Sequence, residues 1–153
     1  MIVRTVQSPR DILAVTNILR TCGKDMAKKY DLHHWDNPWI KTLLIVMICL
    51  IKNKVYVVKA KKIVATYQTK ITEDNLYFEK LAVKPEESGK GIGSFCLKQI
   101  ENEGRKIGCM KVRADVYSKS QHAIQFYQKH GYRRTGENKT LKYEVVCLEK
   151  VLG

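Results

Sequence analysis

The sequence lacks the features of a membrane-spanning or secreted protein. Its longest apolar run, residues 43–51, has Lys41 before it and Lys52 after it. That run is too short to span a bilayer. The first residues lack the long apolar region of a signal peptide. We therefore expect no membrane partner and a cytoplasmic location.

The chain also lacks the cysteine pattern of a disulfide framework or a zinc site. Its five cysteines are odd in number and widely spaced, with no C-x-x-C pair. This usage fits a reducing compartment in which thiols act as small buried hydrophobes. His33 and His34 are adjacent, but neighbouring side chains diverge and no further ligand pattern accompanies them. We expect no metal.

Repeats, low-complexity segments and any sign of a second domain are absent too. The 153 residues, 44% of them apolar, can bury a core without disulfides. They predict a single domain spanning residues 1–153.

The charge has one dominant sign. Lys and Arg number 28 against 15 Asp and Glu, a formal net charge of +13. That balance fits nucleic acid, a membrane surface, an acidic protein or a polyphosphate cofactor, or only a solvated basic surface. The basic residues are scattered rather than gathered in one arm, so nucleic-acid binding is not indicated.

Hydrophobic periodicity predicts an α/β domain in the order βααβββαβαββ. Ser8 and Pro9 mark the start of the first helix, and Gly23 is expected to interrupt it. A turn is expected at residues 136–138, between the last two strands. The predicted strands are residues 2–6, 55–59, 63–71, 76–84, 110–116, 132–134 and 142–152, and the other helices are 39–52, 92–106 and a segment from 118 or 120 to 130. Residues 39–52 are rich in β-branched residues and could also be a buried strand, but their length favours a helix. Mixed strands and helices predict a mixed, twisted sheet flanked by helices.

The most informative stretch is residues 81–94, which read strand, glycine-rich loop, helix. Glycines let the backbone approach a ligand closely, and exposed N–H groups at a helix start bind anions. Lys90 adds positive charge. The spacing is G-x-G-x-G, which matches neither the Rossmann G-x-G-x-x-G nor the nucleotide P-loop. A pyrophosphate cradle and an ordinary strand-to-helix turn both fit the loop alone.

A second motif, residues 115–132, follows one helix later, and the two together resemble the GNAT (GCN5-related N-acetyltransferase) family. The family's acetyl-CoA loop, Q/R-x-x-G-x-G/A, is read here as Ser88-x-x-Gly91-x-Gly93. Its later signature, roughly N-x-x-A-x-x-x-Y-x-x-x-G-F/Y, is read as Ser120-x-x-Ala123-x-x-x-Tyr127-x-x-x-Gly131-Tyr132. Ser88 and Ser120 depart from the usual Gln or Arg and Asn, although both can still form hydrogen bonds.

The resemblance implies a GNAT-like acyl-CoA N-acyltransferase fold and acetyl-CoA as co-substrate. A strand splayed from its neighbour would offer backbone groups to the pantetheine arm and the acetyl carbonyl. The loop backbone would hold the pyrophosphate, and Tyr127 would lie near the cofactor sulfur. The implied cofactor-binding residues are Leu81, Ala82, Val83, Ser88, Gly89, Lys90, Gly91, Ile92, Gly93, Ser94, Ser120 and Tyr127.

Acetyl transfer to an amine needs a lost ammonium proton, a stabilised oxyanion and a protonated thiolate. A backbone N–H near Val83 could stabilise the oxyanion. Tyr127 could act as the acid, because a phenol is protonated at neutral pH, or it could be a core residue. Asp115 and Glu79 are the candidate bases. Alternation along the strand places Glu79 on the same face as Tyr77 and Leu81. Both could equally be structural or solvated carboxylates, and the enzyme could use no residue base.

His34, Trp35 and Tyr77 are the candidate residues for binding the acceptor amine. Aromatic side chains could shape an amine pocket by cation–π contact, or could anchor the helices as a buried cluster. Two other functions stay open: a catalytically silent acyl-CoA sensor and, behind it, a nucleic-acid-binding protein. The acceptor is unassigned, and a homodimer is possible.

Overall fold

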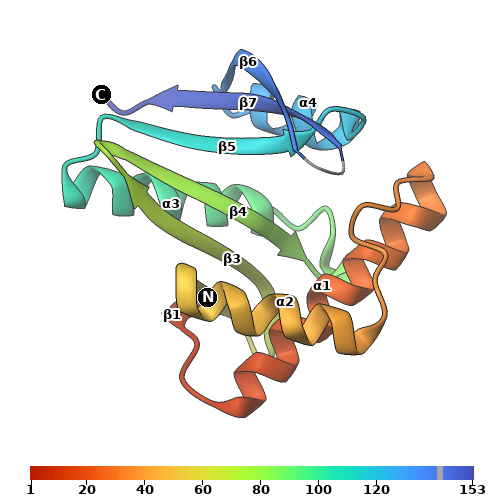
Figure 1. Ribbon diagram of the computed structural model, residues 1–153. Coiled ribbons are helices and arrows are strands. Elements are labelled where there is room, and N and C mark those ends of the chain that lie inside the picture. Colours follow the sequence, from red (N-terminus) through yellow and green to blue (C-terminus); the bar gives the residue numbers. More distant parts are fainter. Residues whose placement is uncertain (141–142) are drawn as a thin grey trace. The chain divides into compact units, whose positions relative to one another are not determined.

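The computed structural model describes residues 1–140 and 143–153. Within these described residues, seven strands form a mixed sheet in the order β1-β2-β3-β4-β5-β7-β6 (Figure 1). The sequence-predicted order βααβββαβαββ is confirmed, with one 3-10 turn, η1, added before the third helix. The strands are β1 (Ile2–Thr5), β2 (Lys54–Lys59), β3 (Ile63–Thr72), β4 (Asn75–Val83), β5 (Lys111–Tyr117), β6 (Arg133–Lys139) and β7 (Glu144–Val151). The helices are α1 (Pro9–Tyr30), α2 (Trp39–Lys52), η1 (Pro85–Glu87), α3 (Ile92–Ile107) and α4 (Gln121–Lys129).

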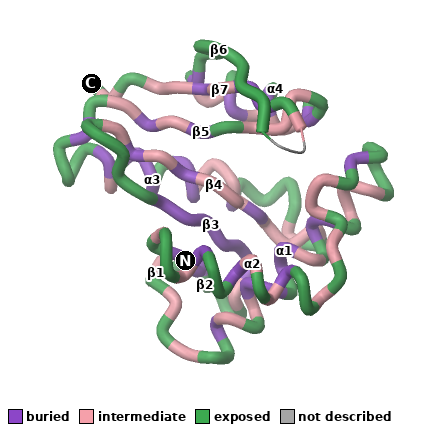
Figure 2. The backbone as a smooth tube through the Cα atoms, viewed as in Figure 1, coloured by how far each residue is buried: buried purple, intermediate pink, exposed green. Residues whose placement is uncertain are grey.

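The chain divides into two compact units, which are described in turn. The first contains Met1–Lys70 and Lys80–Cys96. Here β1 pairs antiparallel with β2, and β2 pairs antiparallel with β3. The apolar faces of α1 and α2 pack with β2 in a core that includes Val15, Val46 and Val57. Figure 2 shows β3 as an almost continuous buried run.

Helix α1 is capped as the sequence predicts, but it is longer than expected. The Ser8 hydroxyl accepts a hydrogen bond from the Asp11 N–H at 3.3 Å, and Pro9 occupies the first turn. The expected interruption at Gly23 is wrong, because the helix continues through it to Tyr30. A Cβ at Gly23 would lie 2.1 Å from the carbonyl oxygen of Trp35. This glycine therefore allows close packing against the chain leading into α2.

The second unit contains Ile71–Glu79 and Leu97–Gly153. Residues 75–77 of β4 pair parallel with residues 111–113 of β5, and β5 pairs antiparallel with β7. One of its cores is aromatic: the Phe78 ring meets Tyr127 and Tyr132, with centroids at 5.7 and 6.0 Å. Gly104 lets α3 pack closely, since a Cβ there would lie 2.8 Å from Leu152 Cδ1.

The expected turn at residues 136–138 is wrong, because these residues lie within β6. The register of β6 with β7 shifts between Arg134 and Gly136, which marks a bulge rather than a reversal. The glycine and asparagine that suggest a turn are therefore tolerated in a fully exposed strand, drawn green in Figure 2. The sequence-predicted last strand starts at residue 142, which lies outside the described residues; the observed β7 is Glu144–Val151.

All five cysteines are free thiols, and every one except Cys147 is buried. This confirms the predicted use of most cysteines as small core residues. Within residues 1–140 and 143–153, no helix is both long and apolar enough to cross a membrane.

Candidate functional site

The first unit presents the strand and loop singled out from the sequence. Residues 80–83 end β4, and the chain then makes the single turn of η1 before α3 begins at Ile92. The Lys84 N–H donates to the Val64 carbonyl of β3 at 2.9 Å. Successive N–H groups of a strand point to opposite sides. The Val83 N–H therefore points away from β3.

Lys80 interrupts β4 with a left-handed backbone, φ +51°. Such a conformation is unusual for a lysine and indicates a kink inside the strand. Before it, Phe78 packs on Tyr127 and Tyr132. After it, Ala82 packs in the core formed with α1 and α2. The expectation that Glu79 and Leu81 share a face rested on unbroken alternation, which this kink removes.

The loop between β4 and α3 has the backbone that its glycines allow. Gly89 and Gly91 both have φ +79°, a conformation that L side chains rarely adopt. A Cβ at either position would meet no atom within 4 Å in the described part of the chain. These glycines are therefore required by conformation and not by internal packing. They leave open space over the backbone.

The start of α3 offers amide groups to an anion. The Phe95 N–H donates to the Gly91 carbonyl at 3.0 Å, in the helix's i to i−4 pattern. The N–H groups of the residues before Phe95, in the first turn of the helix, have no partner within the helix. Together with the helix dipole, they favour a negative group at this end. Lys90, predicted to add positive charge, forms a 2.9 Å ion pair with Glu87, so part of that charge is balanced within the loop.

Cys22 of α1 fixes the end of β4. Its Sγ donates to the Val83 carbonyl at 3.1 Å. Burial, followed by the nearby charges of Asp25 and Glu86, raises the pKa of this thiol to about 12. The sulfur therefore stays protonated and serves as a donor. The position was predicted to be core, but no sequence signal indicated this bond.

The aromatic residues in the segment before α2 have different surroundings. Trp35 packs against the α1–α2 core, with its ring 5.8 Å from that of His34. His33 instead lies between Asp31 and Asp36, and its hydrogen bonds to these carboxylates raise its pKa. A small hollow of about 40 Å³ adjoins Trp35, and its lining is Leu19, Trp35, Asn37, Thr42, Ile45 and Lys80. The structure thus places Trp35, but not His33, at a cavity.

The second unit holds the candidate acid. Tyr127 on α4 is 8% exposed, and its ring contacts those of Phe78, Phe126 and Tyr132 at 5.3–5.8 Å between centroids. Buried tyrosines usually place the hydroxyl against a polar partner. Both interpretations of Tyr127, acid and core residue, are therefore compatible with its place.

A titratable cluster on β4 and β5 contains the candidate bases. The Tyr77 hydroxyl donates to Asp115 Oδ2 at 3.2 Å. Burial first, then the charges of Asp115 and Glu79, raise the pKa of Tyr77. Cys147 faces Asp115 across the β5–β7 ladder, and burial followed by a hydrogen bond to Asp115 raises its pKa. The structure therefore brings Tyr77, Asp115 and Glu79 into one cluster.

Ser120, one of the two residues expected to cap α4, occupies its N-cap position, but its side chain does not cap the helix. The residue is 2% exposed, and its hydroxyl oxygen has no hydrogen-bond partner in the described chain. A buried hydroxyl without a partner costs free energy and calls for an explanation. A ligand group at this position would satisfy it.

Besides the Cys22 bond, two features of the described units were missed from the sequence. One is the left-handed Lys80, which no glycine or proline announces. The other is Glu101 of α3, which accepts from the Tyr132 hydroxyl at 3.1 Å and from Lys150 Nζ at 2.9 Å while only 7% exposed. A glutamate in the helical pattern, next to the apolar Ile100, was the one available signal.

Comparisons with known proteins identify the family. The family model described as "Acetyltransferase (GNAT) family" matches residues 14–132. Thialysine N-epsilon-acetyltransferase of Sus scrofa is 36% identical over 85 residues, which are 54% of this chain and 50% of the relative. The chain thus matches only about half the length of this curated relative.

Solved structures share the fold at low sequence identity. The ribosomal-protein-S18-alanine N-acetyltransferase from Escherichia coli aligns with a TM-score of 0.76 and 16% identity, covering 99% of this chain and 93% of that one. The PaiA N-acetyltransferase from Thermoplasma acidophilum, solved in complex with coenzyme A, aligns with a TM-score of 0.71 and 19% identity, covering 99% of both chains.

Proposed function

Because the chain belongs to the acetyltransferase (GNAT) family, we propose that it transfers an acetyl group from acetyl-CoA to a primary amine of a small molecule or a protein. The observation that carries this proposal is the loop of the first unit. Left-handed Gly89 and Gly91 leave open space over a backbone that leads into α3. This is the local structure that a pyrophosphate needs, and Lys90 in the same loop adds a cation.

The residues present fit the donor. The backbone of residues 88–94 would hold the pyrophosphate, and residues 81–83 would face the pantetheine arm and the acetyl carbonyl. The Ser120 hydroxyl, buried without a partner in the described chain, would find one in the ligand. When bound, acetyl-CoA supplies a thioester carbon open to attack. The Val83 N–H, directed away from β3, would donate to the developing oxyanion.

The transfer exchanges one bond: the amine nitrogen forms a bond to the thioester carbon in a ternary complex, and the carbon–sulfur bond breaks. The ammonium loses one proton before the attack, and the nitrogen loses a second as the amide forms. The departing thiolate gains one proton, and the second proton of the nitrogen restores the donor. We assign that donation to the Tyr127 hydroxyl. Asp115 and Glu79 are the candidate proton acceptors, and capture of the neutral fraction of the amine is the route that needs neither.

The proposed acceptor is a primary amine. His34 and Trp35 in the first unit and Tyr77 in the second are the proposed acceptor residues. Aromatic faces suit a cationic amine. The relative from Sus scrofa is named for thialysine. This makes the side-chain amine of a free amino acid the first acceptor to test, followed by polyamines, aminoglycosides and peptides.

The test measures release of free CoA with this panel, followed by Tyr127→Phe with the accepted amine. We expect turnover to fall by about 10²- to 10⁴-fold, because a general acid contributes that much. Acetyl-CoA affinity should hold, since the loss concerns an interaction made in the transition state. Tyr132→Phe is the matched control. It removes a phenol hydroxyl from the same aromatic cluster, and it should lower thermal stability while turnover persists.

Each other outcome contradicts one part of the proposal. Unchanged turnover in Tyr127→Phe would remove Tyr127 from the mechanism. Tight acetyl-CoA binding without turnover on any amine would favour the silent sensor instead. Failure to bind acetyl-CoA would contradict the proposed function itself.

A further inference from the structure

Helix α2 exposes an apolar stripe. Five large side chains project from one face at helical spacing, and their exposed fractions range from 46% for Met47 to 87% for Ile51. The stripe consists of Ile40, Leu44, Met47, Ile48 and Ile51. The opposite face, with Val46 and Cys49, is buried in the core of the first unit. A helix that is apolar all round is normally buried all round, so its outer face calls for a partner.

The segment that contains this stripe carries charge of one sign. Between residues 37 and 72 there is no Asp or Glu and there are seven lysines, all exposed: Lys41, Lys52, Lys54, Lys59, Lys61, Lys62 and Lys70. Lys41 and Lys52 are eleven residues apart, which is about three helical turns, so both lie along the same flank of the stripe.

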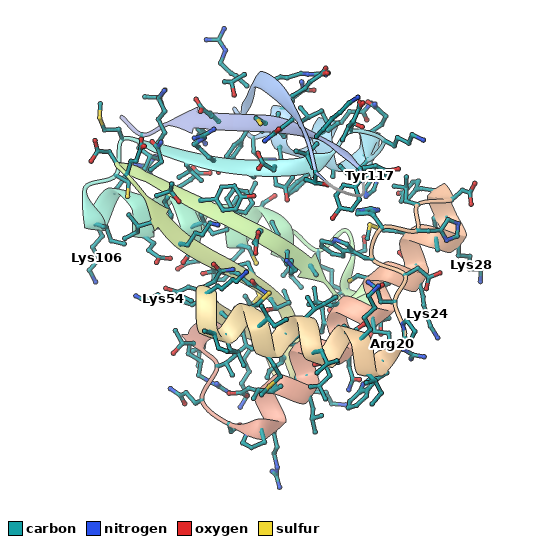
Figure 3. All side chains as sticks on the ribbon, viewed as in Figure 1. Arg20, Lys24, Lys28, Lys54, Lys106 and Tyr117 are labelled. Carbon is teal, nitrogen blue, oxygen red and sulfur yellow. The ribbon has the colours of Figure 1, made fainter. Side chains whose placement is uncertain are left out.

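Helix α1 adds a basic ridge beside the start of α2. Arg20, Lys24 and Lys28 follow at four-residue intervals along α1. Figure 3 shows Arg20 near the start of α2, Lys24 and Lys28 farther along α1, and Lys54 near the other end of α2. The Trp39 indole donates to Asn17 Oδ1 at 3.0 Å, which joins the first turn of α2 to α1 just before this ridge. Cations therefore border the apolar stripe at both ends.

We propose that this face docks on an anionic phospholipid bilayer, with α2 lying in the plane of the membrane surface. The stripe would enter the boundary between headgroups and acyl chains, and the lysine heads would reach the phosphates. Its 14 residues span about 21 Å, so it lies on the bilayer and does not cross it. The expectation of no membrane partner was based only on the absence of a segment long enough to span a bilayer. A helix that lies on the membrane surface does not need that length.

A second copy of the chain fits this face less well. Antiparallel pairing of two α2 helices would place Lys41 of one copy near Lys52 of the other, and parallel pairing would oppose identical lysines. No acidic residue between positions 37 and 72 could neutralise them. Nucleic acid would satisfy the lysines but not the five apolar side chains.

The test is flotation of the full chain with vesicles of phosphatidylcholine alone and with vesicles that also contain phosphatidylglycerol. We expect binding to the second and little to the first. Leu44→Ser with Ile48→Ser should weaken binding at least about tenfold, because two of the five inserted apolar side chains are lost from the middle of the stripe. Lys41→Gln with Lys52→Gln should cost roughly fivefold per lysine. Ile107→Ser with Met110→Ser is the matched control, since these side chains are 47% and 64% exposed in the other unit and should not matter.

Three results would overturn the proposal. The first is failure to float with phosphatidylglycerol vesicles, and the second is equal binding to both vesicle types. The third is a dimer, seen by light scattering, that Leu44→Ser with Ile48→Ser converts to monomers; this would assign the stripe to a second copy. Melting temperature and acetyl-CoA affinity should stay unchanged in all variants, because none of these residues is buried or belongs to the proposed donor site.

Discussion

The two units of this chain build their candidate functional groups differently. The first relies on backbone: left-handed Gly89 and Gly91, the helix start at Ile92, and a carbonyl held by Cys22. The second relies on side chains: the Tyr77–Asp115 pair, buried Tyr127, and Glu101 joined to two partners. The difference teaches which substitutions each unit can accept. Added Cβ atoms should be harmful in the first unit, and lost polar groups in the second.

Gly23→Ala should have the largest effect on stability. The new Cβ would lie 2.1 Å from a backbone carbonyl of the same unit, which cannot move without shifting the chain before α2. We expect a loss of about 3 kcal/mol, measured by urea unfolding. Gly104→Ala in the second unit is the control. There the contact is a flexible leucine tip at 2.8 Å, so the change should stay within about 1 kcal/mol. Equal losses of stability in the two variants would show that the first unit is no more sensitive to an added Cβ than the second.

Gly91→Val should abolish the rise in melting temperature that acetyl-CoA causes. A β-branched residue is strained at φ +79°, so the loop would relax away from the conformation that holds the pyrophosphate. We expect at least about a hundredfold loss of affinity, roughly 2.7 kcal/mol, by calorimetry. Gly136→Ala in β6, which also faces open space but lacks a positive φ, should bind normally. Wild-type affinity in Gly91→Val would show that this loop does not hold the cofactor.

Glu101→Ala tests the side-chain network of the second unit. It would leave the Tyr132 hydroxyl and Lys150 without their shared acceptor, at a cost of about 2 kcal/mol. Glu101→Gln should recover part of this, because one amide oxygen can still accept. If Glu101→Ala unfolds like wild type, the second unit does not depend on the network.

Asp11→Asn should have the smallest effect and is the exception within the first unit. Asp11 accepts from Arg4 at 2.6 Å and from the Gln7 N–H at 2.9 Å, and the bond to Arg4 is the main cause that lowers its pKa to about 2. A depressed folded pKa stabilises the protein above the ordinary value near 4 and ceases to do so as the pH falls toward about 2. We expect a loss of about 1 kcal/mol at neutral pH and a flatter stability curve between those values. An equally steep curve in the variant would assign the pH dependence to other groups.

Most of the fold could be predicted from local pattern, because periodicity and caps act within a few residues. Helix α2 was placed at its observed bounds, and Ser8 with Pro9 marked the start of α1. The errors came from contacts distant in sequence. Gly23 was expected to interrupt a helix, but it lies within α1 and makes room for the backbone of Trp35. Residues 136–138 were expected to form a turn, but they belong to β6 and pair with β7.

The candidate site divides in the same way. The glycine loop could be found from residues 88–93 because backbone freedom is encoded in residue type. The left-handed Lys80 and the Cys22 bond to Val83 could not, because each depends on how β4 meets its neighbours. The pairing of Tyr77 with Asp115 also needed the β4–β5 register, which places residue 77 opposite residue 113.

The burial of Cys22 also bears on redox chemistry. Every turnover of the proposed reaction would release free CoA, itself a thiol, and a thiolate in the protein could form a mixed disulfide with it under oxidation. Cys22 donates to Val83, one of the proposed donor-binding residues, yet with a pKa of about 12 it is almost never a thiolate at neutral pH. Burial likewise raises the pKa of Cys96, in the first turns of α3, to about 12. Two cysteines can therefore lie in the elements of the proposed donor site without reacting, and CoA is the reactive thiol there.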